Sequence, residues 1–95
     1  MNNYIPLSSL AMDLKRAAVG YYRNSIKSAD RFYLEALKRK QEIDPKSIPP
    51  YLVNLLNEVG RLPKIKDGVE KGEKALLLAT LFQNAAISLV NNRKY

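Results

Sequence analysis

The sequence predicts an all-α protein, a small antiparallel helical bundle made of a long, a short and a long helix. Three segments carry apolar residues at the three- and four-residue spacings of one helix face. No segment shows the alternation of apolar and polar residues, bounded by turn residues, that is typical of a β-strand. With 95 residues, the chain is expected to form one helical domain over residues 1–95.

The first helix is predicted over about residues 7–43. Ser8 fits the N-cap, with Leu7 and Met12 placed as a hydrophobic staple on either side of it. Pro45 disfavours helical angles at the residue before it, and therefore ends the helix. We expect the whole segment to be one amphipathic helix.

Small residues run along the centre of the apolar face of this helix. The line consists of Ala11, Ala18, Ser25, Ala29 and Ala36. Small side chains allow a facing helix to approach closely, so we expect this line to be buried. Gly20 is the weak point, because glycine costs about 1 kcal/mol relative to alanine inside a helix. A kink or break near Gly20 is therefore the alternative to a continuous helix.

The second helix is predicted over about residues 50–59. Pro50 suits the first helical position, and Gly60 suits the residue after the helix ends. One face of the segment is apolar at helical spacing, through Leu52, Leu55, Leu56 and Val59. This pattern predicts a single buried stripe.

The third helix is predicted over about residues 68–91. Asp67 and Glu70 have the spacing of a capping box at its start. Apolar residues extend nearly all round this helix, and such helices are usually buried on more than one side. We therefore expect it to be the central element of the bundle, packed antiparallel to the first helix.

The length of the first helix favours self-association. A continuous helix of this length would measure about 55 Å, whereas a compact chain of 95 residues has a diameter of roughly 30 Å. A break at Gly20, a projecting end or a second chain would each resolve the mismatch. We predict a C2 homodimer. The candidate interface residues are three leucines that a monomer would struggle to hide and one glutamine that would fix register: Leu34, Leu77, Leu81 and Gln83.

The net charge of +7 raises the question of a polyanionic partner. Five cations share one side of the predicted first helix over roughly 33 Å. They are Arg16, Arg23, Lys27, Arg31 and Lys38. Such a row could follow a nucleic-acid backbone. The alternative is a solvated face, because acidic residues border the row at spacings suited to ion pairs.

Several chemistries are excluded or disfavoured by composition. The chain has no cysteine and no histidine, which removes disulfides, thiolate metal sites and histidine-activated nucleophiles. We predict no cofactor, no metal and no enzymatic activity. The N-terminus does not resemble a signal peptide, and no unbroken apolar run approaches the roughly 18 residues of a membrane span, so we expect a cytoplasmic protein. The first hypothesis for function is a self-associating interaction or assembly module, and the second is a nucleic-acid-binding accessory protein.

Overall fold

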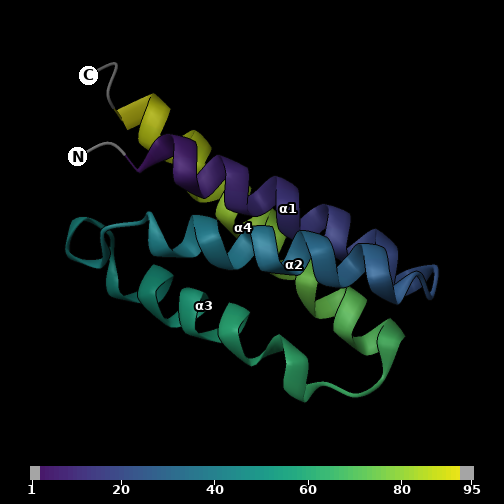
Figure 1. The fold of residues 1–95 in the computed structure, drawn as a ribbon. Coiled ribbons are helices and arrows are strands. Elements are labelled where there is room, and N and C mark those ends of the chain that lie inside the picture. The colour runs from purple at the N-terminus through teal and green to yellow at the C-terminus, as the bar shows by residue number, and fades with distance from the viewer. Residues whose placement is uncertain (1–2, 93–95) are drawn as a thin grey trace.

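The computed structural model describes residues 3–92, and within this range it contains four α-helices and no strand (Figure 1). The helices are α1 (Tyr4–Tyr22), α2 (Ile26–Gln41), α3 (Pro50–Arg61) and α4 (Gly68–Asn92), with short 3₁₀ helices at Pro45–Ser47 and Leu62–Lys64. Consecutive helices run in opposite directions (Figure 1). The all-α prediction is confirmed, but the prediction of three helices is wrong.

The prediction of one continuous helix over 7–43 is wrong, and the alternative of a break near Gly20 is confirmed: α1 ends at Tyr22, and α2 folds back from Ile26 as the second arm of a helical hairpin. Asn24 adopts a left-handed conformation with φ of 57°. Its N–H donates to the Tyr21 carbonyl at 3.2 Å, and the Ser25 N–H donates to the Gly20 carbonyl at 2.8 Å. This pair of hydrogen bonds is the Schellman motif that ends many helices. The motif requires a left-handed residue, and asparagine tolerates that conformation better than any other residue type except glycine. The apolar periodicity continues through the turn, which is why the pattern concealed the break.

Gly20 lies at a close approach between the two helices of this hairpin. A Cβ atom on Gly20 would lie 2.8 Å from the Cβ of Ala29 and 2.9 Å from the Ala29 backbone nitrogen. The alanines of the predicted small-residue line are all buried, whereas Ser25 is exposed in the turn. Small residues therefore allow α2 to fold back onto α1, rather than extend one long helix.

The N-terminal capping prediction is wrong. Helix α1 begins at Tyr4, so Ser8 lies within it, and Met12 is exposed instead of covering Leu7. Asn3 takes the N-cap position, and its backbone carbonyl accepts a hydrogen bond from the Leu7 N–H at 3.0 Å. The Asn3 side-chain oxygen also accepts from the Asp44 N–H at 3.2 Å, which fastens the start of α1 to the loop after α2.

Helix α1, not the last helix, is the central element. It packs along α2 on one side and along α4 on the other, whereas α4 meets α3 over a much smaller area. Figure 1 shows α4 passing behind α1 and α2. The Cα atoms extend 44 Å by 19 Å by 18 Å, so the hairpin shortens the molecule well below the length of the predicted helix. Because α1 and not α4 is central, part of the apolar surface of α4 remains exposed to solvent.

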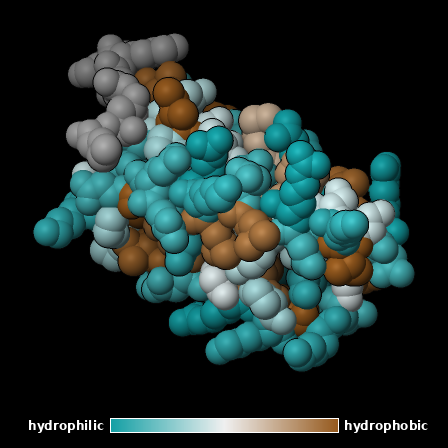
Figure 2. Space-filling view, in the orientation of Figure 1, coloured by the Kyte–Doolittle hydropathy of each residue, from teal (hydrophilic) through white to brown (hydrophobic). Residues whose placement is uncertain are grey.

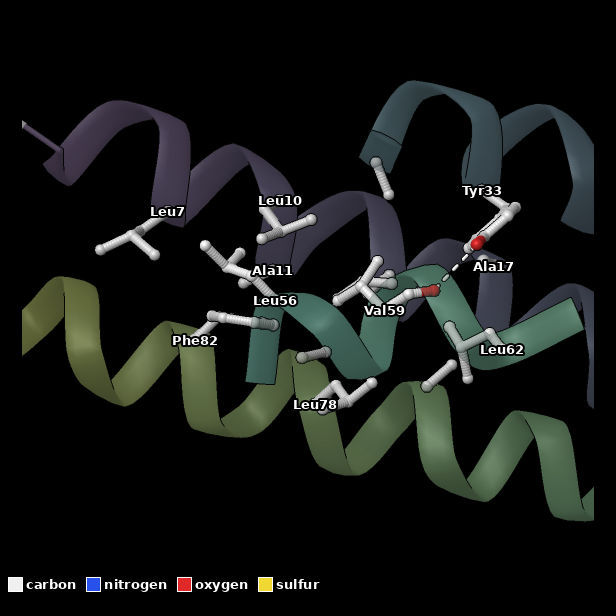
Figure 3. Close-up of a cluster of buried hydrophobic side chains, with 14 of the residues drawn as sticks. Leu7, Leu10, Ala11, Ala17, Tyr33, Leu56, Val59, Leu62, Leu78 and Phe82 are labelled. Atoms are coloured by element: carbon white, nitrogen blue, oxygen red, sulfur yellow. Dashed lines mark hydrogen bonds between the residues drawn. The ribbon is translucent and has the colours of Figure 1, made fainter. Parts of the chain in front are cut away.

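Helix α3 covers the lower part of the core. Leu56 and Val59 project toward Phe82 and Leu78 of α4 and toward α1 (Figure 3). The Tyr33 hydroxyl donates to the Val59 carbonyl at 2.8 Å, which joins α2 to α3 (Figure 3). The helix starts at the predicted proline but continues past the predicted end to Arg61, because Gly60 stays helical.

Helix α4 begins where the sequence predicted. The Asp67 carboxylate accepts a hydrogen bond from the Glu70 N–H at 3.0 Å, which is one of the two bonds of the expected capping box. Near its N-terminal end, Lys74 forms an ion pair with Glu58 of α3. Its buried face packs on α1 through small and large apolar residues: Ala75, Leu78, Ala79, Phe82, Ala85 and Ala86.

Candidate interaction surfaces

The structure does not bring the four predicted interface residues together. Leu34 lies on α2 and is 59% exposed. Leu77 and Leu81 lie one helical turn apart on one flank of α4, where Leu77 borders a hollow beside Ile65. Gln83 lies on the opposite flank, in a groove between α4 and α1. The prediction of a shared interface therefore separates into three distinct surfaces.

A groove lies between α1 and α4. Its volume is about 290 Å³. The α1 side supplies Ala11, Met12 and Lys15, and the α4 side supplies Leu76, Ala79, Thr80, Gln83 and Asn84. Lys15 is the one charged residue among these lining groups. The groove is thus mainly apolar, with a polar group of residues on α4.

The edges of this groove carry an extended apolar surface, which we call the α1/α4 face. It consists of six exposed residues: Met12 and Leu76, which line the groove, and Ile5, Val69, Ile87 and Val90, which lie on the same sides of α1 and α4 by their spacing. Val19 continues the α1 line but borders the depression between α1 and α2. On α1 these residues are seven positions apart, and on α4 a seven-residue repeat links Val69, Leu76 and Val90 through Gln83. Two turns of a helix take about seven residues, so each set lies along one line. Half of the twelve large apolar residues that are exposed in the described part of the chain belong to the α1/α4 face.

The opposite side is different. Figure 2 shows the surface over α2 and α3, where small apolar groups are separated by polar side chains. Leu34 and Tyr51 belong to α2 and α3 and are each more than half exposed. Singly exposed apolar residues of this kind are normal on soluble proteins, whereas contiguous apolar surfaces usually mark interfaces.

The hairpin also divides the predicted basic stripe. Arg16 and Arg23 border a depression of about 260 Å³ between α1 and α2. The Arg16 guanidinium carbon lies 5.7 Å from the centre of the Phe32 ring, and a guanidinium nitrogen lies 3.8 Å from the Asp13 carboxylate. Arg16 is thus held against the seam between the two helices.

The other three cations remain together on the outer side of α2. Lys27, Arg31 and Lys38 surround Leu34. The Lys38 ammonium lies 3.3 Å from the Glu35 carboxylate, so one of these charges is partly compensated. The row extends over about 17 Å, which is half the predicted length. In place of a continuous stripe, the structure leaves three cations around a hollow that Asp30 and Glu35 also line.

One carboxylate is buried between α1 and α2. The Asp13 oxygens lie 3.8 Å from Arg16 and 3.9 Å from the Arg39 Nε. Burial raises the pKa of Asp13, although the two guanidinium groups act in the opposite direction. The Arg39 Nε is itself buried without a hydrogen-bond partner, while its Nη1 lies 3.3 Å from Glu42. The Glu35 carboxylate is also near enough to raise the pKa of Asp13 by charge repulsion, and the cluster closes the seam with charged groups.

No grouping of three or more potential metal-ligating side chains occurs among residues 3–92. The sequence prediction of no metal and no cofactor stays a prediction, since the structure carries no ligand that tests it. The four predicted interface residues and the five predicted cations likewise remain candidates. Sequence analysis did not propose Ile5, Met12 or Val19 as interface residues, although their seven-residue spacing was visible in the sequence.

Helix α4 has the length and composition of a possible membrane span over Gly68–Asn91. In the structure, 33% of the most apolar 18-residue stretch of this helix is buried inside the protein. The core helix of a soluble protein satisfies the same criteria, and a single such helix is weak evidence for a span. The expectation that no segment enters a membrane therefore stays a prediction.

Comparison of the chain with protein-family models, with curated proteins and with solved structures found no match. The proposal for function therefore depends on the sequence and on the surfaces described above.

Proposed function

We propose that this chain is a non-enzymatic self-association module in which a second copy covers the α1/α4 face, giving a C2 homodimer. The supporting observation is that exposed apolar residues of α1 and α4 flank one groove, with Met12 and Leu76 lining it from its two sides. Monomeric soluble proteins rarely expose contiguous apolar surfaces of this kind, because covering them releases free energy through the hydrophobic effect.

The size of the α1/α4 face suits a second copy. The α4 edge from Val69 to Val90 is about 32 Å long, and two helices side by side are about 20 Å wide. The product is roughly 600 Å² per partner, which approaches the roughly 800 Å² per partner of a stable standard interface. A single peptide helix is only about 10 Å wide and would cover about half of this width.

The charge distribution also suits a second copy. A two-fold contact places the same surface on both partners, so a charge close to the two-fold axis meets its own copy. Lys15 is the one charge that lines the groove, and its long side chain can keep the ammonium group in water while its methylenes pack. Two copies can therefore meet without burying opposed like charges.

Sedimentation equilibrium of matched variants tests this proposal. We expect the wild-type chain to approach twice its 10.8 kDa mass as concentration rises. Met12→Glu and Leu76→Glu should each return it to the single-chain mass with unchanged helix content, because each introduces a buried unpaired charge at the contact. Leu34→Glu and Leu77→Glu are the matched controls, and they should leave the dimer intact. A wild-type chain that stays at single-chain mass at its solubility limit would contradict the proposal.

The second candidate is a nucleic-acid-binding accessory protein. Lys27, Arg31 and Lys38 on α2 favour it, together with the net charge of +7. Binding through these groups should weaken steeply as salt rises. Titration with duplex DNA and with RNA at about 50 mM salt tests this. No binding at that salt would exclude the candidate, and unchanged binding by Arg31→Glu with Lys38→Glu would exclude this patch.

A further inference from the structure

A polar group of residues interrupts the α1/α4 face near the middle of its α4 edge. Thr80, Gln83 and Asn84 lie within little more than one helical turn and line the groove. We call these three residues the polar band. Apolar residues of the same face lie on both sides of it, Val69 and Leu76 before and Ile87 and Val90 after.

Gln83 occupies a position that the repeat would otherwise give to an apolar residue. It lies seven residues after Leu76 and seven before Val90, and its side chain is half-buried in the groove. The Thr80 hydroxyl donates to the Leu76 carbonyl at 3.1 Å. The side-chain amides of Gln83 and Asn84 make no hydrogen bond with any other residue that the structure describes. The band thus presents unused donors and acceptors in the middle of an apolar surface.

We infer that the Gln83 amide fixes the register of the homodimer by hydrogen bonding to the polar band of the second copy. This inference rests on the proposed self-association. With the two bands in contact, each Gln83 side chain can donate and accept, and the apolar residues on both sides of the band meet apolar residues.

Other registers leave the amides without partners. A shift of seven residues along α4 would place Gln83 opposite Leu76 or Val90 of the second copy. A buried amide without a hydrogen-bond partner is strongly disfavoured, so a shifted dimer should be populated at least about tenfold less. A single polar residue at a core position fixes register and oligomeric state in coiled coils for the same reason.

The experiment compares Gln83→Leu with Gln41→Leu, the same substitution at an exposed position of α2 outside the face. Sedimentation equilibrium reports whether each chain forms dimers. Backbone amide NMR spectra of the dimer report how many registers are present. The wild-type chain and Gln41→Leu should each give one set of resonances for a symmetric dimer. Gln83→Leu should still form dimers, of equal or higher affinity, but give several sets of resonances from shifted registers.

The side-chain NH₂ resonances that Gln83→Leu removes provide a second measurement. In the wild-type chain they should exchange with water at least about tenfold more slowly at dimer-forming concentrations than after dilution to monomer, because the amide is bonded in the dimer. A Gln83→Leu dimer with one set of resonances, or a Gln83 amide that exchanges equally fast in monomer and dimer, would overturn the inference and leave self-association standing. A wild-type monomer at all concentrations would overturn both.

Discussion

The two edges of α1 differ in how they meet solvent. Toward α2, the contact is closed by small residues at Gly20 and Ala29, and its rim carries Asp13, Arg16 and Arg39. Toward α4, the buried contact is equally apolar, but its rim carries the exposed residues of the α1/α4 face. A charged rim is stable in water, whereas an apolar rim gains free energy when it is covered. The α2 side is therefore closed mainly by charged groups, whereas the α4 side leaves apolar residues exposed to water.

Substitution at Gly20 should have the largest effect on stability, because it directly disrupts the close contact between α1 and α2. Gly20→Val would place its Cβ within 2.8 Å of the Ala29 Cβ and 2.9 Å of Ala29 backbone atoms, which cannot move without shifting α2. We expect a loss of about 3 kcal/mol in the free energy of unfolding, measured by urea denaturation.

Gly60→Ala is the matched control for that substitution. Gly60 is also helical, but a Cβ there would meet only the Lys40 ammonium at 3.8 Å. We expect it to stabilise the protein by about 0.5–1 kcal/mol through helix propensity. Equal effects of the two substitutions would show that Gly20 is not required for the close contact.

A smaller effect is expected where α2 is held from its other side. The Tyr33 hydroxyl donates to the Val59 carbonyl at 2.8 Å in a buried position. Tyr33→Phe removes the donor without changing the packing of the ring, so the free energy of unfolding should fall by about 1 kcal/mol. The sedimentation behaviour should not change, because Tyr33 is remote from the α1/α4 face. A variant of wild-type stability would mean that this bond does not hold α2 to α3.

The smallest effect is a dependence on pH at the charged rim. Burial raises the pKa of Asp13 above its unfolded value of 3.8, so the folded state holds a proton that the unfolded state has already lost. The stability of the wild-type chain relative to Asp13→Asn should therefore fall as pH rises from below 3.8 through the folded-state pKa, and then stay constant. Urea denaturation of both chains over this pH range measures the difference. A difference that rises with pH would mean that Arg39 and Arg16 outweigh the burial of Asp13.

Much of the fold followed from local patterns. The start of α3 at Pro50, the start of α4 at Gly68 with its Asp67 cap, and the burial of the alanine line all agree with the sequence analysis. The hairpin did not follow, because a turn built on Asn24 preserves the apolar spacing on either side of it. Glycine also has two opposite meanings in a helix: Gly20 weakens it locally, yet permits the close approach that determines the fold.

The candidate surface was harder to predict than the fold. Sequence analysis identified Gln83 but grouped it with Leu77 and Leu34, because the number of leucines on α4 indicated excess apolar surface without saying which flank α1 would cover. Met12 was predicted to form a hydrophobic staple with Leu7. Because α1 begins at Tyr4, Met12 lies instead within the helix, on the α1/α4 face. Which flank of a helix stays exposed depends on its neighbours, and one helix's periodicity does not contain that information.

Methyl NMR with a soluble paramagnetic probe tests most directly whether the α1/α4 face becomes covered while the surface of α2 stays exposed. The methyl groups of Met12, Leu76 and Ile87 report on the α1/α4 face, and those of Leu34 provide the comparison on α2. We predict that the first three are shielded from the probe at high protein concentration and become accessible on dilution, while Leu34 stays accessible throughout. Met12 and Leu76 methyl groups that are as accessible as Leu34 at every concentration would contradict the account.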